Sequence, residues 1–150
     1  MINVLFVCHG NICRSPMAEF LMKDLVEKAG LKEKFYIESA ATSTEEIGAG
    51  VYPQVRRILN DRGIDCSEKR ARQMTAADYD RFDYIICMDE MNLRNMKRIS
   101  ADPYGKYRKL LDFAGETGDV ADPWYTGNFS ITQYDIERGC KALLETLLKG

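Results

Sequence analysis

The sequence contains little of several things that would mark other kinds of protein. Its 150 residues include one histidine and one tryptophan. No apolar run approaches the ~18 residues of a membrane span, and the N-terminus, Met1-Ile2-Asn3-Val4, lacks the regions of a secretory signal. Charge is nearly balanced, with 21 Lys and Arg against 23 Asp and Glu. We therefore expect neither a general nucleic-acid-binding surface nor a polybasic membrane surface.

No Cys and His cluster has the spacing of metal ligands, so we expect no metal requirement and no cofactor. The five cysteines are odd in number and scattered. Without a signal peptide, reduced thiols in the cytoplasm are the expectation. Apolar residues make up 45% of the chain and charged residues 29%, which is typical of one soluble globular domain with a real core.

The most informative stretch lies near the N-terminus, where an apolar run is followed by a polar loop. The run Val4–Val7 stops at Cys8, and Arg14 follows after five intervening residues. Ser15 and Pro16 come next, and they suit the N-cap and the first position of a helix. A strand, a tight loop and a helix N-terminus are how α/β proteins hold a phosphate group. We therefore expect a phosphate-binding loop after the first strand.

This loop combines several chemical functions. Its backbone N–H groups are expected to point inward and form an anion-binding nest, and Gly10 permits either a positive φ or a close approach of another group. The N-terminus of a helix and a neighbouring cation favour the thiolate form of a cysteine. Arg14 can hold two phosphoryl oxygens in a bidentate fork. The loop therefore offers a nucleophile, an oxyanion cradle and a charged clamp.

The spacing of a cysteine five residues before an arginine is weak evidence by itself. Cys66 and Arg72 have the same spacing, but they lack a preceding apolar strand, an intervening glycine and a Ser-Pro helix start. We interpret this second copy as coincidence. For Cys8 the competing interpretation is a small buried apolar residue at the end of a strand.

Apolar periodicity predicts alternating strands and helices along the rest of the chain. Further strands are expected at about 35–39 and 82–88, with a short last one around 110–111, and helices at 17–29, 53–63, 75–81, 89–99 and 131–148. Thr75 and Asp78 have the form of a capping box, and Asp89 can cap the helix after it. The segments 40–51 and 114–130 are expected to be loops. This alternation predicts a parallel sheet covered by helices on both faces, with the site at its carboxyl edge.

A thiolate that attacks phosphorus needs an acid for the leaving oxygen and later a base for water. His9 lies within the loop, where its backbone N–H matters more than its ring, and we expect the ring at the pocket mouth. Asp122 precedes Pro123, which restricts it to extended geometry, and Trp124 and Tyr125 supply flat apolar surface. A carboxyl group beside aromatic walls can keep a proton and act as an acid. The alternative is an ordinary Asp-Pro turn with exposed aromatic residues.

Together these stretches resemble the low-molecular-weight protein tyrosine phosphatases. The motifs occur in the family order over nearly the whole chain. They are Val-Cys-His-Gly-Asn-Ile-Cys-Arg-Ser-Pro at 7–16 with Ala18-Glu19, Ser-Ala-Ala-Thr-Ser at 39–43, Ala-Arg-Gln at 71–73, Phe-Asp-Tyr-Ile-Ile-Cys-Met-Asp at 82–89, and Asp122-Pro123.

The resemblance implies a three-layer α/β/α fold with a four-stranded parallel sheet, and a single phosphatase domain over residues 1–150. It implies hydrolysis of phosphotyrosine and aryl phosphates through a phosphocysteine. The implied catalytic residues are Cys8 as nucleophile, Arg14 as transition-state clamp and Asp122 as general acid and then base. The implied substrate-binding residues are His9, Gly10, Asn11, Ile12, Cys13, Ser15, Trp124 and Tyr125.

The resemblance also assigns supporting roles. Ser15 is expected to hydrogen-bond the Cys8 thiolate, and Asn11 to hold the loop in an unusual conformation with Ser39 as its partner. Cys13 is expected to form a reversible disulfide with Cys8 that protects it from over-oxidation, which suits a reactive thiol with a close neighbour; simple packing is the alternative. Asp89 is expected to support or cap near the site rather than to react.

Two positions depart from the family pattern. Glu45, followed by Glu46, stands where many relatives have an aromatic residue that forms one wall of the cleft. Lys69 stands where the family often has a histidine. Neither position belongs to the chemical trio, but both bear on substrate preference, since an acidic rim disfavours acidic phosphopeptides. A solvated loop is the alternative for the glutamates.

Other functions are compatible with parts of this pattern. A thiol-dependent arsenate reductase needs two further cysteines close together, and Cys87 has no such neighbour. A phosphocarrier must keep its phosphocysteine, which Arg14 and Asp122 argue against; a silent phosphate-binding module is disfavoured by the intact trio. The expected partners are a phosphotyrosine-containing protein or another aryl phosphate, with inorganic phosphate as product. We expect no nucleic-acid or membrane partner, and a monomer in the cytoplasm.

Overall fold

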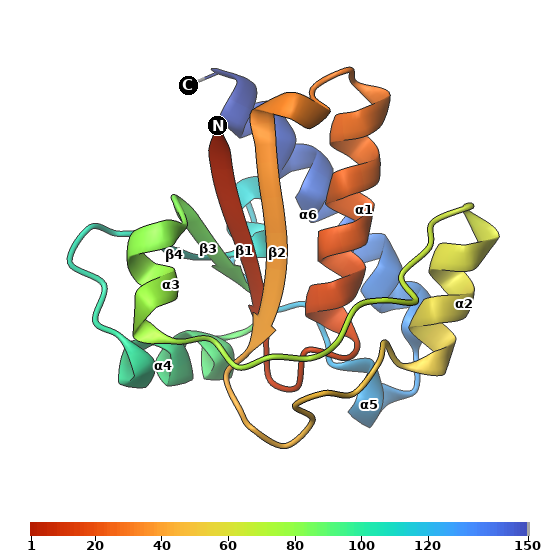
Figure 1. The fold of residues 1–150 in the computed structure, drawn as a ribbon, viewed down its shortest axis with the longest axis horizontal. Helices are drawn as coiled ribbons and strands as arrows, with labels where there is room; N and C mark the ends of the chain where they lie inside the picture. Colours follow the sequence, from red (N-terminus) through yellow and green to blue (C-terminus); the bar gives the residue numbers. More distant parts are fainter. Residues whose placement is uncertain (150) are drawn as a thin grey trace.

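The computed structural model describes residues 1–149. They form a four-stranded sheet with helices packed around it (Figure 1). The strands are β1 (Ile2–Cys8), β2 (Phe35–Ala41), β3 (Tyr84–Cys87) and β4 (Tyr107–Lys109). The α-helices are α1 (Arg14–Lys28), α2 (Pro53–Asp61), α3 (Ala76–Arg81), α4 (Glu90–Ile99), α5 (Pro123–Thr126) and α6 (Phe129–Lys149), and the 3₁₀ helices are η1 (Lys32–Lys34) and η2 (Leu110–Ala114).

The sheet is wholly parallel, as the alternation of strands and helices predicts. Its order is β2-β1-β3-β4, with β1 between β2 and β3. A strand that is buried on both faces is apolar throughout, and Val4–Val7 is fully buried. The central position of β1 therefore fixes where the loop after Cys8 emerges.

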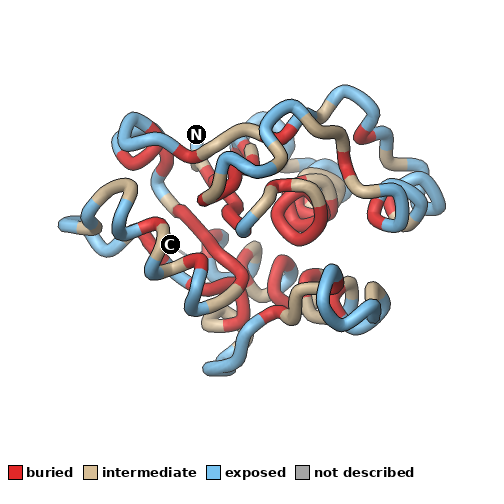
Figure 2. The backbone as a smooth tube through the Cα atoms, turned by 90° about the horizontal axis from the view of Figure 1, so that it is seen from below, coloured by how far each residue is buried: buried red, intermediate tan, exposed pale blue. Residues whose placement is uncertain are grey.

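Helices cover both faces of the sheet, and the side chains of β1 point alternately into two cores. Val4 and Phe6 belong to the core beneath α1 and α6. Leu5 and Val7 belong to the core beneath α3 and α4, which includes Met96 of α4. Figure 2 shows the buried segments running through the interior and the exposed positions on the outer turns. The arrangement is the three-layer α/β/α fold expected from the sequence.

The carboxyl ends of the strands share one edge of the sheet, at the bottom of Figure 1, where the loop from β1 to α1 lies near α5. The start of β1 and the last turns of α6 lie at the opposite end of the molecule. Two predicted helix caps support this edge. Thr75 and Asp78 form a capping box at α3, and Asp89 accepts a hydrogen bond from the Asn92 N–H at the start of α4. Among residues 1–149, no helix combines the length and the apolar character needed to cross a membrane.

Several element boundaries differ from the sequence predictions. The last strand ends at Lys109, and Leu110 and Leu111 lie in η2, because the Asp112 side chain accepts from the Lys109 N–H and turns the chain. The predicted loop at 114–130 contains the short helix α5. Helix α6 begins two residues earlier than predicted, and the Asn128 side chain accepts from the Ile131 N–H there.

Helix α1 also begins earlier than predicted, and Ser15 does not cap it. The helix begins at Arg14 with Cys13 in the N-cap position, and no side chain caps this end. Ser15 lies in the first turn with its hydroxyl directed toward Cys8. The serine is therefore part of the loop network, and the missing cap leaves the N–H groups of the first turn directed at the loop.

Candidate active site

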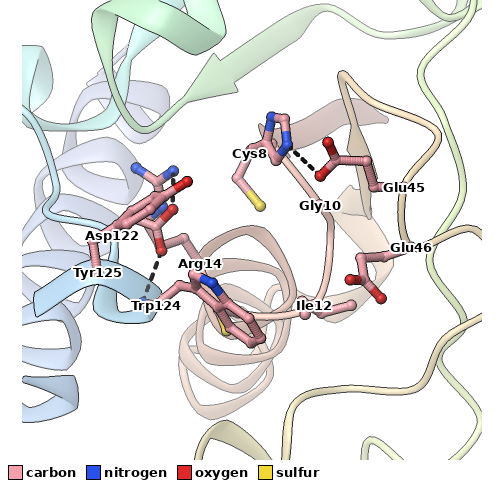
Figure 3. A pocket seen from close by; sticks show the side chains of 11 residues that line it. Cys8, Gly10, Ile12, Arg14, Glu45, Glu46, Asp122, Trp124 and Tyr125 are labelled. Carbon is pink, nitrogen blue, oxygen red and sulfur yellow. Dashed lines mark hydrogen bonds and ion pairs between the residues drawn. The ribbon is translucent and has the colours of Figure 1, made fainter. Parts of the chain in front are cut away.

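A pocket of ≈ 330 Å³ opens at the carboxyl edge of the sheet (Figure 3). Its floor is the loop between β1 and α1, and its walls come from the segments after β2 and before α6. In Figure 3 the Cys8 sulfur faces the space between Asp122, Trp124 and Tyr125 on one side and Glu45 and Glu46 on the other. The lining residues are Cys8, His9, Gly10, Ile12, Cys13, Arg14, Glu45, Glu46, Asp122, Trp124 and Tyr125.

Cys8 is the last residue of β1 and lies almost fully buried at the floor. Its Sγ accepts hydrogen bonds from the backbone N–H groups of Asn11, at 3.3 Å, and Ser15, at 3.4 Å. The Ser15 Oγ lies 3.0 Å from the sulfur. Ser15 Oγ accepts from the Asn11 amide at 2.8 Å, and its own proton has two acceptors within reach, the Cys8 sulfur and the Ala40 carbonyl at 3.4 Å. These donors stabilise negative charge on Cys8.

The loop owes its tight curl to Asn11 rather than to Gly10. Asn11 has φ 59°, the only positive φ at a non-glycine residue among positions 1–149, while Gly10 is not in this region. A Cβ at Gly10 would lie 3.4 Å from Cγ of Glu46, which is an ordinary van der Waals contact, so the space beside the loop does not require glycine there either.

A buried polar network holds Asn11 in this conformation. Asn11 Nδ2 donates to Ser39 Oγ at 2.9 Å, and Ser39 Oγ donates to the carboxylate of Glu19 at 2.5 Å. Lys69 Nζ donates to the carbonyl of Ser39 at 2.8 Å and lies 3.3 Å from Glu19. Because each buried group has a partner, the network fixes one arrangement of the loop. Lys69 thus lies behind the loop and not on the pocket wall.

Arg14 is 2% exposed, and two different segments of the chain contact its guanidinium. Nη1 donates to Asp89 at 2.7 Å and to the carbonyl of Val120 at 2.9 Å, and Nη2 donates to Asp122 at 3.5 Å. Burial opposes its charge, but Cys8 and the two carboxylates outweigh burial and raise the pKa of Arg14. A permanent positive charge therefore lies beside the Cys8 sulfur.

Asp122 stands at the N-cap of α5 in extended geometry, as the following proline requires. Its Oδ1 accepts from the Trp124 N–H at 3.0 Å, and its Oδ2 is the atom nearest Arg14. Trp124 and Tyr125 are 58% and 84% exposed, so they form an open aromatic wall. Tyr52 packs against the Trp124 ring edge-on, with centroids 5.4 Å apart. The carboxyl group thus lies between the buried guanidinium and the aromatic wall.

The opposite wall of the pocket is acidic. His9 Nε2 lies 2.8 Å from Oε2 of Glu45, so the imidazole lies at the mouth and pairs with the rim. Glu46 follows and lies against Gly10. Among residues 1–149 the Glu46 carboxylate has no ion-pair partner, whereas that of Glu45 has one. The pocket therefore combines a cationic floor, an aromatic wall and an acidic wall.

Cys13 reaches the pocket from the start of α1 but is chemically distinct from Cys8. Burial, together with the charges of Cys8 and Asp122, raises the pKa of the Cys13 thiol to about 12. It therefore stays protonated at neutral pH. Both cysteines are free thiols in the structure.

The structure brings most of the predicted site residues together. Asn11 and Ser15, predicted among the substrate-binding residues, are buried behind the loop and do not line the pocket. The second Cys and Arg pair lies elsewhere, with Cys66 buried in the core and Arg72 paired to Asp78. Glu19 and Lys109 have structural roles near the site that the sequence analysis did not identify. A lone acidic or basic residue carries no pattern, so only the fold reveals its partners.

Comparison with known proteins agrees with this geometry. The family model "Low molecular weight phosphotyrosine protein phosphatase" matches residues 3–150. The chain is 41% identical to the low molecular weight protein-tyrosine-phosphatase YfkJ of Bacillus subtilis, over 99% of this chain and 97% of that protein. It is also 41% identical to a low molecular weight phosphotyrosine protein phosphatase of Gallus gallus, over 95% and 94% of the two chains.

Solved structures give the same result. The crystal structure of YfkJ superposes with a TM-score of 0.95 at 41% identity, covering 99% of this chain and 96% of that one. A Drosophila arginine phosphatase superposes with a TM-score of 0.86 at 29% identity, covering 96% of each chain. Family match, sequence relatives and fold coincide over nearly the full length, so this chain belongs to the low molecular weight phosphotyrosine protein phosphatase family.

Proposed function

We propose that this protein hydrolyses phosphotyrosine and other aryl phosphates through a phosphocysteine intermediate. The observation that carries the proposal is the meeting of Cys8, Arg14 and Asp122 in one pocket, with three donors directed at the sulfur. The family and its named relatives are protein-tyrosine phosphatases. The roles of individual residues follow from the geometry.

In the first step the Cys8 thiolate attacks phosphorus, and the bond to the aryl oxygen breaks. Asp122, at the aromatic wall, gives its proton to the leaving phenolate. In the second step the Asp122 carboxylate takes a proton from water, which attacks the phosphocysteine. The thiolate then leaves with the Ser15 hydroxyl as its hydrogen-bond donor, and inorganic phosphate is released. The same carboxyl group serves both steps because it ends the first one deprotonated.

Arg14 is suited to hold the phosphoryl group as it transfers. A guanidinium has five N–H donors, and Asp89 and Val120 use both of those on Nη1. Asp122 takes one on Nη2, which leaves the Nε edge for two phosphoryl oxygens. Together with the backbone N–H groups of the loop, this fork stabilises the charge that develops in the transition state. Asp89 orients the clamp and does not react.

Hydrolysis of p-nitrophenyl phosphate in the presence of EDTA tests this function. We expect the wild type to turn over and Cys8→Ser to be inactive. Acid catalysis by a positioned side chain is worth ~10²–10⁴-fold, so Asp122→Ala should lose about that factor. Cys66→Ser is the matched control, since it removes a cysteine from the second Cys and Arg pair, and it should retain activity. An inactive wild type, or turnover by Cys8→Ser, would reject the phosphatase function and favour a binding module or a carrier.

The leaving group needs its own test because one structural neighbour is named an arginine phosphatase. We propose phosphotyrosine as the preferred substrate, since Trp124 and Tyr125 offer flat surface on which a phenyl ring can stack. Two peptides that differ only in carrying phosphotyrosine or phosphoarginine should be compared by kcat/KM. A higher value for phosphoarginine would contradict the proposal.

We also propose that peroxide converts Cys8 and Cys13 into a disulfide. Peroxide oxidises the Cys8 thiolate to a sulfenic acid and leaves as hydroxide, and the Cys13 thiol then attacks the sulfenic sulfur, so that the S–S bond forms and water leaves. The high pKa of Cys13 makes the second step slow. Wild type treated with excess peroxide should lose 2 Da and recover activity with dithiothreitol, whereas a second peroxide should carry Cys8 of Cys13→Ser on to the sulfinic acid, which dithiothreitol does not reduce. Recovery of Cys13→Ser with dithiothreitol would reject this protective role.

The setting of the enzyme is part of the same proposal. A thiolate nucleophile and buried free thiols suit a reducing compartment such as the cytoplasm. The expected partner is a phosphotyrosine-containing protein, with inorganic phosphate released, and neither nucleic acid nor membrane takes part. We expect a monomer, and light scattering of the purified protein measures this directly.

A further inference from the structure

Lys109, at the end of β4, is a buried cation outside the pocket with three acceptors. Its side chain is 8% exposed. Nζ lies 3.0 Å from the carbonyl of Thr117, 3.0 Å from Oδ1 of Asp119 and 3.0 Å from Oε1 of Glu90. An ammonium has three N–H donors, so each has an acceptor. Burial opposes this charge, but the hydrogen bonds to Asp119 and Glu90 outweigh burial and raise the pKa of Lys109.

The acceptors of Lys109 are chain neighbours of the groups that hold Arg14. Arg14 bonds Asp89 and the Val120 carbonyl. Lys109 bonds Glu90, which follows Asp89, and Asp119, which precedes Val120. Arg14 and Lys109 therefore hold the same two segments of the chain at adjacent residues, Arg14 at the pocket and Lys109 behind it. A displacement of Glu90 or Asp119, which bond Lys109, also displaces the neighbouring group that bonds Arg14, because one peptide unit joins the two.

Within the part of the chain that the structure describes, the segment that Lys109 holds is anchored independently only near its start. There Glu116 pairs with Arg138, and the Glu116 N–H donates to the Leu111 carbonyl. Residues 115–119, Gly-Glu-Thr-Gly-Asp, are exposed. A Cβ at Gly118 would meet nothing within 4 Å. Beyond them the chain is fixed again where the Val120 N–H donates to the Met88 carbonyl, and Asp122 follows two residues later. Two glycines in an exposed stretch give a flexible backbone, so Lys109, through Thr117 and Asp119, fixes the last part of the segment before Val120 and Asp122.

We propose that Lys109 is a positioning residue that aligns Arg14 and Asp122 by joining the segment 88–90 to the segment 117–122. This inference rests on the proposed phosphatase function. It does not make Lys109 a catalytic residue, since the ammonium lies outside the pocket. It assigns a kinetic role to a side chain that bonds only protein groups.

The substitution Lys109→Met tests the proposal. Methionine keeps an apolar stem of similar length, and Glu90 and Asp119 can be hydrated once unpaired because their side chains are 58% and 44% exposed. The fold should therefore survive. Small misplacements of reacting groups cost up to about 10²-fold, so we expect kcat/KM to fall by roughly 10–100-fold. Lys109→Arg, which keeps the charge and the donors, should recover most of the loss.

The dependence on the leaving group separates positioning from simple destabilisation. A misplaced Asp122 matters more when the phenolate is a poor leaving group. The loss in kcat/KM for Lys109→Met should therefore be larger with phenyl phosphate than with p-nitrophenyl phosphate. Iodoacetate labelling of Cys8, blocked by inorganic phosphate, counts the folded sites. A loss equal for both esters and matched by fewer labelled sites would overturn the proposal.

Two further variants sharpen the result. Asp119→Asn weakens one of the three bonds at an exposed acceptor, and it should show the same leaving-group pattern with a smaller loss of about two- to fivefold. Lys106→Met is the matched control, because Lys106 lies one residue before β4 and donates to the carbonyl of Tyr79, away from the pocket. It should leave kcat/KM unchanged. If the wild type hydrolyses neither ester, the proposed function is rejected. If the wild type hydrolyses them and Lys109→Met has the same kcat/KM, only the positioning role of Lys109 is rejected.

Discussion

The two cysteines of the loop differ in reactivity although only four residues separate them in the sequence. Cys8 receives two backbone N–H groups and lies beside Arg14, whereas Cys13 is buried beside other negative groups, which raises its pKa to about 12. Reactivity follows the thiolate and not the thiol. The surroundings of each sulfur therefore decide which cysteine is the nucleophile.

Alkylation should show this difference. At pH 7 iodoacetamide should modify Cys8 in the wild type, and Cys8→Ser should remain unlabelled at Cys13 over the same time. Because the Cys13 pKa is raised, its labelling should stay slow up to about pH 9. Peptide mapping by mass spectrometry measures both sites. Rapid labelling of Cys13 in the native protein would contradict the assignment.

Glu46, another residue of the pocket, places a carboxylate at the mouth of an anion-binding site. Removing this charge should lower the KM for dianionic substrates by about two- to fivefold, the size of an exposed charge interaction. The substitution Glu46→Gln should also favour acidic phosphopeptides over neutral ones, an effect that weakens with added salt. Steady-state kinetics at two ionic strengths measures this.

Glu45→Gln is the control for that experiment. Its carboxylate already pairs with His9 at 2.8 Å, so the substitution should change the preference less than Glu46→Gln does. An equal effect of the two variants would show that the rim acts only through its total charge.

At the scale of elements, helix α6 approaches η2 so closely that one position admits only glycine. A Cβ at Gly139 would lie 2.5 Å from Cγ of Leu110, and both residues are buried. This contact places η2, and with it the start of the segment that leads to Asp122. The sequence shows Gly139 only as a break in a helical pattern.

Gly139→Ala should therefore destabilise the protein although alanine favours helices. Overpacking a core costs about 1–3 kcal/mol, and the gain in helix propensity offsets about 1 kcal/mol. We expect the free energy of unfolding in urea to fall by up to about 2 kcal/mol. Gly118→Ala, with open space around the new methyl group, should change it by less than about 0.5 kcal/mol. A more stable Gly139→Ala would show that Leu110 can move aside without cost.

At the scale of the whole molecule, Asp102 lies in the loop between α4 and β4 and links this loop to helix α3. Its carboxylate accepts from Tyr79 Oη at 2.6 Å and from the backbone N–H groups of Lys106 and Tyr107. Burial opposes its charge, but these hydrogen bonds outweigh burial and lower the pKa of Asp102 below its ordinary value of 3.8. A carboxyl group with a lowered pKa stabilises the folded state above the unfolded pKa.

This stabilisation should be complete above about pH 5 and should disappear as pH falls through the folded pKa of Asp102, which lies below 3.8. Asp102→Asn should lower the free energy of unfolding at pH 7 by about 1–2 kcal/mol, since it weakens hydrogen bonds to a charged group. The difference from the wild type should vanish near pH 2. Urea titrations at several pH values measure it, with the exposed Asp80→Asn as control. A difference that persists at pH 2 would reject the ionised carboxylate as the cause.

The sequence by itself determined the alternation of strands and helices, the buried first strand, the loop that follows it, and Cys8 and Arg14 as candidates for the chemistry. These are encoded locally, because apolar periodicity, caps and one dense motif each lie within a few adjacent positions. Local sequence left Asp122 open between a general acid and an ordinary Asp-Pro turn, and the family resemblance gave it its expected role.

The boundaries near Ser15, Leu110 and residues 123–126 differ from the prediction because particular side-chain bonds decide them. Ser15 turns to the Cys8 sulfur, while Asp112 and Asp122 accept from backbone N–H groups two or three residues away.

Only the tertiary structure decided which groups meet. It placed Asp122 beside Arg14, paired His9 with Glu45, put Lys69 behind the loop and gave Lys109 its three acceptors. Each of these contacts joins segments that are apart in the chain, and charged residues have no periodic pattern that predicts a partner. The parallel sheet brings them together because it delivers the end of every strand to one edge.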